Sequence, residues 1–203
     1  MRSALGSLAL GLGLVLLAGG AVGARAANPS ANPDPDVLPK IGNVAPAFGL
    51  KAFRAKGEED DLREVVELDN YCGVRPLDGL KLVLVVFADQ ASATSDFGVL
   101  NSWARKFEKD GLHTIVISTE AENSRMKELV SKGRQTWPVL DDRFGVVQRR
   151  YGIQGAPFSL LLDERCHVLG MSNKSISADS DRLAATIDDI LSGRLGEYDY
   201  DAE

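Results

Sequence analysis

The segment Lys81–Ser118, "KLVLVVFADQASATSDFGVLNSWARKFEKDGLHTIVIS", contains the pattern that decides the fold. It opens with consecutive apolar residues in Lys81–Phe87, which is typical of a strand covered on both faces. Apolar residues at helical spacing follow over Ser95–Asp110, and Leu112–Ser118 is a second apolar strand. The segment therefore predicts a β-α-β unit with two parallel, buried strands.

Weaker patterns on either side complete the order of elements. We expect, in chain order, an edge strand at Ala45–Leu50, a strand at Val65–Leu68, helices at Ala121–Gly133 and about Phe144–Tyr151, strands near Phe158–Leu162 and Cys166–Met171, and a helix at about Asp179–Leu191. Ser95 or Asp96 is expected to cap the central helix and Gly111 to end it. The charged stretch 51–64 is expected to be a solvated loop. This order predicts an α/β fold, a central mixed sheet flanked by helices.

The first 26 residues have the plan of a secretory signal peptide. Arg2 precedes an apolar run, and Ala24-Arg25-Ala26 has the A-x-A form of a cleavage site. The alternative is a membrane anchor, for which the glycine-interrupted run is marginally short. We expect cleavage after Ala26 and an exported, periplasmic protein with no stable membrane span. The expected organisation is a signal peptide at 1–26, a Pro/Asn/Asp-rich linker at 27–40, one domain at 41–192 and an acidic tail at 193–203.

The charge and the metal-binding residue types exclude several classes of function. The chain has 29 acidic and 23 basic residues, a formal net charge of −6, so it has no basic footprint for nucleic acid. Two cysteines and two histidines, at positions 72, 166, 113 and 167, have no spacing that would make a metal set. We expect no metal and no cofactor.

Two phrases carry a resemblance to a known family: "GLHTIVISTE" at 111–120 and "VLDDRFGVVQRRYGIQGAPFSLLLDERCHVLG" at 139–170. With the order of elements, they resemble the thioredoxin-like redoxins. These include peroxiredoxins of the alkyl hydroperoxide reductase/thiol-specific antioxidant type and exported TlpA-like thioredoxins. The resemblance implies a thioredoxin-like fold over about Ile41–Leu191. It also implies that Pro157, after Ala156, is in the cis form and faces the active-site loop, where the alternative is a trans proline starting an edge strand. Trp137 matches a residue expected to pack near that loop.

The same resemblance places the family's catalytic positions on residues that are not cysteines. TlpA-like members carry C-x-x-C after the central strand, and those positions fall on Ser92 and Ser95. Peroxiredoxins place their peroxidatic cysteine in the same loop or the next helical turn, yet no cysteine lies anywhere from Gly73 to Arg165. Both chemistries need a thiolate, and an unactivated hydroxyl is far too weak an acid to replace it. The family's usual site is therefore predicted to be degenerate.

The two cysteines that remain, Cys72 and Cys166, have three open interpretations. They form a structural disulfide, or they are separate idle thiols, or one is a displaced redox centre and the other its resolving partner. We therefore expect a redox-inactive binding or accessory protein of the cell envelope, with a protein or peptide as partner. The alternative is an antioxidant or thiol-disulfide oxidoreductase that uses Cys72 or Cys166. Neither the partner's identity nor the oligomeric state follows from these features.

Overall fold

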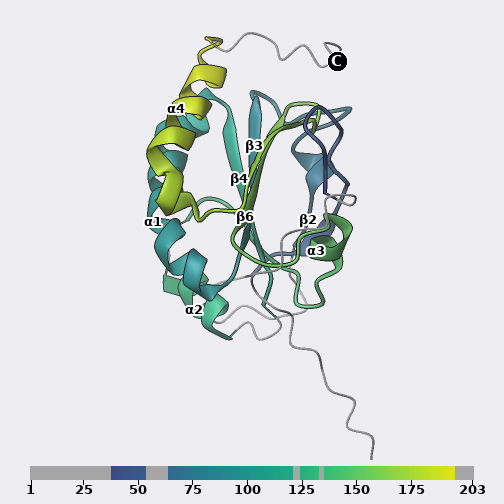
Figure 1. The fold of residues 1–203 in the computed structure, drawn as a ribbon, viewed down its shortest axis with the longest axis vertical. Helices are drawn as coiled ribbons and strands as arrows, with labels where there is room; N and C mark the ends of the chain where they lie inside the picture. Colours follow the sequence, from purple (N-terminus) through teal and green to yellow (C-terminus); the bar gives the residue numbers. More distant parts are fainter. Residues whose placement is uncertain (1–37, 54–63, 121–123, 133–134, 195–203) are drawn as a thin grey trace, which may run out of the picture.

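A five-stranded mixed sheet forms the centre of the molecule (Figure 1). The computed structural model describes residues 38–53, 64–120, 124–132 and 135–194. The sheet has the order β5-β4-β3-β6-β7, with β3, β4 and β5 parallel and β6 and β7 antiparallel to their neighbours. The strands are β3 (Leu82–Ala88), β4 (Leu112–Ser118), β5 (Val139–Asp141), β6 (Phe158–Asp163) and β7 (Val168–Ser172). The predicted α/β fold with a central mixed sheet is confirmed.

Helices cover both faces of this sheet. The α-helices are α1 (Gln90–Phe107), α2 (Ser124–Lys132), α3 (Val146–Arg150) and α4 (Ser180–Leu191), and the 3-10 helices are η2 (Leu68–Asn70), η3 (Glu108–Asp110) and η4 (Ile176–Asp179). Figure 1 shows α1, α2 and α4 together on one face, and α3 on the other with a small hairpin. That hairpin pairs β1 (Gly49–Lys51) with β2 (Val65–Glu67).

The consecutive apolar residues of β3 explain why two layers form. Every residue of β3 is buried. Val83, Val85 and Phe87 contact the core under α3 and the hairpin, while alternate residues such as Leu84 and Val86 contact the core under α1 and α4. Because side chains alternate between the faces of a strand, a strand that is apolar at every position must be covered on both sides.

The amino end of α1 differs from the prediction. The helix starts at Gln90, with Asp89 as its N-cap, so the expected caps Ser95 and Asp96 lie inside its first turns. Asp89 is the N-cap, rather than Ser95 or Asp96, because it forms a capping box. Its carboxylate accepts a hydrogen bond from the Ser92 N–H at 2.8 Å, and Ser92 Oγ accepts one from the Asp89 N–H at 3.1 Å. The α-helix itself ends at Phe107, η3 extends the helical segment by three residues, and Gly111 ends that segment with φ 108° in the left-handed region, where the prediction placed the stop.

Other boundaries shift for reasons outside the local sequence. The strand expected at Ala45–Leu50 forms only at Gly49–Lys51 and pairs in the hairpin, because Ala45 and Phe48 are drawn into the core instead. Strand β5 was not expected, since three residues after Pro138 carry little local signal, and pairing with β4 creates it. Helix α2 begins at Ser124 in the described chain. The predicted leader, most of the linker, the centre of the charged loop at 54–63 and the tail from 195 lie outside the described residues.

Candidate functional site

The register of the sheet brings the Pro157 turn beside the start of α1. Phe87 of β3 pairs with Phe158 of β6. Ala88, which follows Phe87, is therefore level with Pro157, which precedes Phe158. Ala88 leads directly into Asp89 and helix α1. This is the sheet end at which the resemblance places an active-site loop, and residues separated by some 70 positions meet there because the strands are antiparallel.

The Ala156–Pro157 peptide bond is cis, as the resemblance predicts. Ala156 and Pro157 are both half-buried. Neither the N–H nor the C=O of Ala156 makes a hydrogen bond to any other residue in the described part of the chain. An extended segment of another chain could therefore pair with this backbone without displacing an internal bond.

The two serines that the sequence resemblance places at catalytic positions both make hydrogen bonds inside the fold. Ser92 is buried, and its Oγ donates to Asp89 Oδ1 at 2.7 Å in the capping box. Ser95 is exposed, and its Oγ donates to the Ser92 carbonyl at 2.9 Å and to Asp96 Oδ1 at 3.1 Å. These bonds stabilise the first turns of the helix, and the carboxylates that accept them are weaker bases than the imidazole that commonly activates a serine.

The two acids at the start of α1, Asp89 and Asp96, have structural partners. Asp89 is the N-cap already described, and Asp96 is only 1 % exposed. The carboxylate of Asp96 accepts from Ser175 Oγ at 2.8 Å, from the Ser177 N–H at 3.0 Å and from the Ile176 N–H at 3.1 Å. Asp96 therefore holds the start of η4 against α1. Sequence reasoning missed this role, because nothing local links residues 80 positions apart.

Trp137 lies in the core on the α1 face of the sheet. Its ring meets that of Phe97 edge-on, with 4.9 Å between the ring centroids. Its Nε1 is buried and has no hydrogen-bond partner among the described residues. The indole also borders a small pocket of about 60 Å³ that includes Tyr71 and His113. These contacts describe a packing residue, and a binding role for Trp137 remains a prediction.

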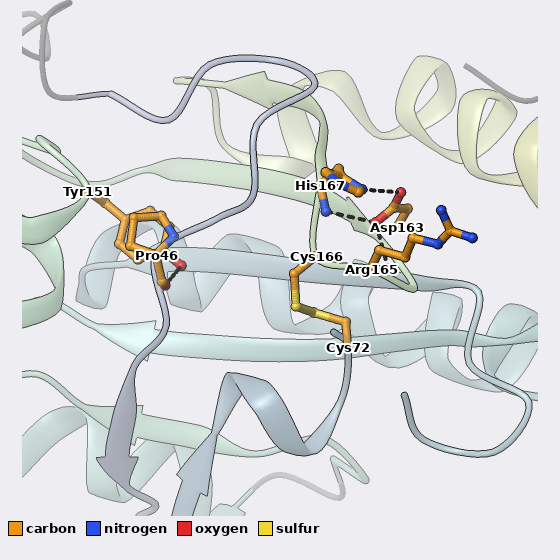
Figure 2. Close-up of a disulfide and its surroundings, with 7 residues drawn as sticks. All are labelled: Pro46, Cys72, Tyr151, Asp163, Arg165, Cys166 and His167. Atoms are coloured by element: carbon orange, nitrogen blue, oxygen red, sulfur yellow. Dashed lines mark hydrogen bonds and ion pairs between the residues drawn. A yellow bond between two sulfur atoms is a disulfide. The ribbon is translucent and has the colours of Figure 1, made fainter. Parts of the chain in front are cut away.

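Cys72 and Cys166 form a disulfide, with their Cα atoms 5.2 Å apart (Figure 2). Cys72 follows η2, and Cys166 lies in the turn between β6 and β7 with φ 65°. Asp163 holds this turn by accepting from the Arg165 N–H at 2.8 Å and the His167 N–H at 2.7 Å. The two cysteines are 0 % and 3 % exposed, so water and soluble thiols have little access to the sulfur atoms.

The disulfide and the Pro157 turn lie at opposite ends of β6. The strand starts at Phe158, next to Pro157, and ends at Asp163, which is paired with Leu82 at the beginning of β3. At about 3.3 Å per residue the strand separates the two sites by roughly 17 Å. The structure thus brings together the two cysteines and, separately, the Pro157 turn with the end of β3 that leads into α1, but it does not bring the cysteines to the Pro157 turn.

No group of three or more metal-binding side chains is found within the described residues. No helix in the same part of the chain is long and apolar enough to cross a membrane.

Tyr151 is the largest fully buried side chain of the described residues, and its hydroxyl donates a hydrogen bond to the Pro46 carbonyl at 2.6 Å (Figure 2). Burial raises the pKa of this phenol well above its ordinary value, so it stays a neutral hydrogen-bond donor.

No protein-family model matches this sequence, and no curated protein matches it. Solved structures do resemble its fold. A Chlorobium tepidum protein described as a thiol:disulfide interchange protein, DsbE, has a TM-score of 0.62 and 22% identity over 75% of this chain and 99% of its own. Mycobacterium tuberculosis AhpC has a TM-score of 0.60 and 15% identity, over 79% of this chain and 97% of its own. Reduced 2-Cys peroxiredoxin of Plasmodium vivax has a TM-score of 0.58 and 19% identity, over 76% of this chain and 83% of its own. At these identities the likeness establishes the fold alone.

Proposed function

We propose that this chain, whose fold is thioredoxin-like, is an exported protein that binds an extended segment of a partner protein at the Ala156–Pro157 turn and performs no thiol chemistry there. One observation carries the proposal: the only cysteines are bonded to each other at the far end of β6, while the backbone of the turn is free. The site that remains next to α1 has donors and acceptors for a peptide backbone but no thiol.

The rival function, an antioxidant or thiol-disulfide oxidoreductase acting through Cys72 or Cys166, has less support. A thiolate must reach a disulfide or a peroxide to react, so redox cysteines are normally accessible and their thiolates stabilised. Both sulfur atoms here are buried in the core formed by residues such as Leu80 and Val168. This burial favours a brace that ties η2 to the β6–β7 turn.

Export is part of the proposal and rests on two observations. The first is the leader with its A-x-A site at Ala24–Ala26. The second is the disulfide itself, because such bonds persist in oxidising compartments and are rare where thiols are kept reduced. We accordingly propose that the protein works in the cell envelope.

A redox assay tests the absence of thiol chemistry. Disulfide reduction and peroxide reduction would be measured for the wild type and for the Cys72→Ser/Cys166→Ser double variant. We expect the two proteins to show the same background rates, since the wild-type cysteines are inaccessible. A wild-type rate clearly above that of the double variant would overturn the proposal in favour of the oxidoreductase.

A binding assay tests the role of the turn. The probe is a reduced and alkylated polypeptide, which is unfolded and presents extended segments, titrated into ¹⁵N-labelled mature protein. We expect amide shifts at Gly155 and Ala156, and at least a fivefold weaker affinity in Ala156→Arg, whose side chain would block the approach. Ala185→Arg adds the same side chain on an exposed position of α4 and should bind normally. Equal binding by both variants would show that the turn is not the site.

A further inference from the structure

A cavity of about 200 Å³ lies between the sheet and α4. It is on the opposite face of the sheet from the core cluster that contains the disulfide. We call it the α4 cavity. Its walls come from β6, β7, η4 and α4, and its apolar surface includes Leu84, Leu161, Leu169, Leu183 and Ile190. An apolar chamber of this kind attracts the apolar part of a ligand, because little of its surface can hydrogen-bond to water.

Gly170 keeps this cavity open. It pairs with Leu161 across β6 and β7, so a side chain at 170 would point to the same face as Leu161, toward α4. A Cβ built there meets nothing within 4 Å. Gly170 is not among the glycines with positive φ, so neither backbone conformation nor crowding requires glycine at this place. The missing side chain leaves room that a ligand can occupy.

A hydroxyl with no internal partner lines the same cavity. Ser159 is 4 % exposed and lies two residues before Leu161 on the same face of β6. Its Oγ makes no hydrogen bond to any residue that the structure describes. The fully enclosed side-chain atoms without a partner in the described chain are Gln135 Oε1 and Trp137 Nε1, so the Ser159 oxygen is accessible and can hydrogen-bond to water or to a bound molecule.

The mouth of the α4 cavity has an exposed cation whose side chain makes no hydrogen bond to the described residues. Two basic side chains border it, Lys174 and Arg182. Arg182 is already paired with Asp179, which accepts from its Nε at 2.9 Å. The ammonium of Lys174 makes no ion pair or hydrogen bond within the described chain; its charge interaction there is a longer-range attraction to Asp179, which Arg182 already pairs. An anionic group at the mouth would find its partner in Lys174.

We propose that the α4 cavity binds a small aliphatic monocarboxylic acid of about eight carbons, since a cavity of roughly 150 Å³ holds the six carbons of benzene. The apolar chain lies between Gly170 and α4, beside Ser159, and the carboxylate pairs with Lys174. This site is independent of the Pro157 turn, so either proposal can fail without the other.

Titration with octanoate tests the proposal on ¹⁵N-labelled mature protein. We expect saturable binding with a Kd below about 1 mM, and amide shifts at Gly170, Ser159 and Lys174. Butyrate and octanol are the comparison probes, because the first lacks the apolar length and the second lacks the charge. Absence of saturation by octanoate up to 10 mM, or equal affinity for octanol, would overturn the proposal.

Matched variants locate the ligand. Gly170→Leu fills the cavity and should weaken octanoate binding at least tenfold, whereas Gly98→Leu adds the same side chain in open space on α1 and should leave it unchanged. Lys174→Gln should weaken octanoate two- to fivefold, roughly the effect of losing one exposed ion pair, and leave octanol unaffected. If Gly170→Leu fails to fold by circular dichroism, Gly170→Ala, with a smaller but measurable loss, replaces it. Unchanged binding in a folded Gly170 variant would refute the site.

Discussion

Asp96 shows how one side chain can be expected from the sequence to cap its own helix and instead hold a distant segment in the fold. It follows the degenerate serine positions on α1, yet it is buried and accepts hydrogen bonds from the backbone of Ile176 and Ser177. Those N–H groups belong to the first turn of η4, which has no partner of its own for them. The carboxylate therefore links α1 to the segment that leads into α4.

We predict that Asp96→Ala lowers the free energy of unfolding by about 2–4 kcal/mol, because it leaves several buried donors without an acceptor. Urea unfolding at neutral pH measures the effect. Asp78→Ala removes an exposed acid and should change stability by less than about 0.5 kcal/mol. A loss below 1 kcal/mol in Asp96→Ala would mean that water replaces the carboxylate.

The two cysteines make a prediction of their own. The disulfide closes a sequence separation of 94 residues, so it restricts the unfolded chain strongly. Cys72→Ser/Cys166→Ser should lose about 2–5 kcal/mol of stability. Reductant should lower the stability of the wild type during equilibrium unfolding and leave the variant unchanged. Denatured wild type should show no thiols before reductant is added, and two afterwards; thiols in the unreduced sample would contradict the bond.

At the scale of elements, the start of α1 was predicted less well than its end. Gly111 is read correctly because a glycine with positive φ ends a helix by a local mechanism. Several residues before the helix could cap it, and the choice of Asp89 depends on where β3 ends. Strand β5 has the same explanation: its three residues become a strand by pairing with Val116–Ser118 of β4.

We predict that Ser92→Ala lowers the free energy of unfolding by about 1 kcal/mol, because it removes half of the capping box at Asp89. Thermal or urea unfolding measures the loss. Ser102→Ala, in the exposed middle of the same helix, is the matched control and should be nearly neutral. If both variants have equal stability, the Ser92 hydroxyl is not holding the helix start and is free for another role.

A pH effect is expected at the beginning of β4. Burial lowers the pKa of His113 from its ordinary value of 6.5, against a smaller opposing effect of Glu108. The unfolded chain then takes up the proton first as the pH falls. The stability of the wild type relative to His113→Phe should therefore be highest above about pH 6.5 and decrease below it. Urea unfolding of both proteins at pH 7.5 and 5.5 measures this, and a difference independent of pH would contradict it.

At the scale of the whole molecule, the two ends of the sheet carry different features. The disulfide lies at the end where β3 starts, and the Pro157 turn lies at the opposite end, beside the start of α1. The α4 cavity lies on a face rather than at an end, between β7 and α4. Because of this separation, the disulfide brace and the two proposed binding sites do not overlap in the domain.

The prediction for the whole chain concerns its processing. Expressed with its leader in a host that exports proteins, the chain should be recovered outside the cytoplasm beginning at Ala27. Intact mass and N-terminal sequencing measure this. Ala26→Arg should prevent cleavage, since a small residue is required at that position, and the uncleaved form should stay with the membrane. A wild-type protein that retains Met1 and is membrane-bound would favour an anchor.

The sequence alone determined the longer buried strands β3, β4 and β6 and the main helices, because that information lies in the spacing of apolar residues along each segment. It also determined that no thiol stands at the usual catalytic position, since Gly73–Arg165 contains no cysteine. Only the tertiary structure decided that Cys72 and Cys166 are bonded, that Asp96 serves η4 and that Gly170 opens a cavity. Each of these depends on the register between strands and helices far apart in the chain, and register is set by the packing of the whole core rather than by neighbouring residues.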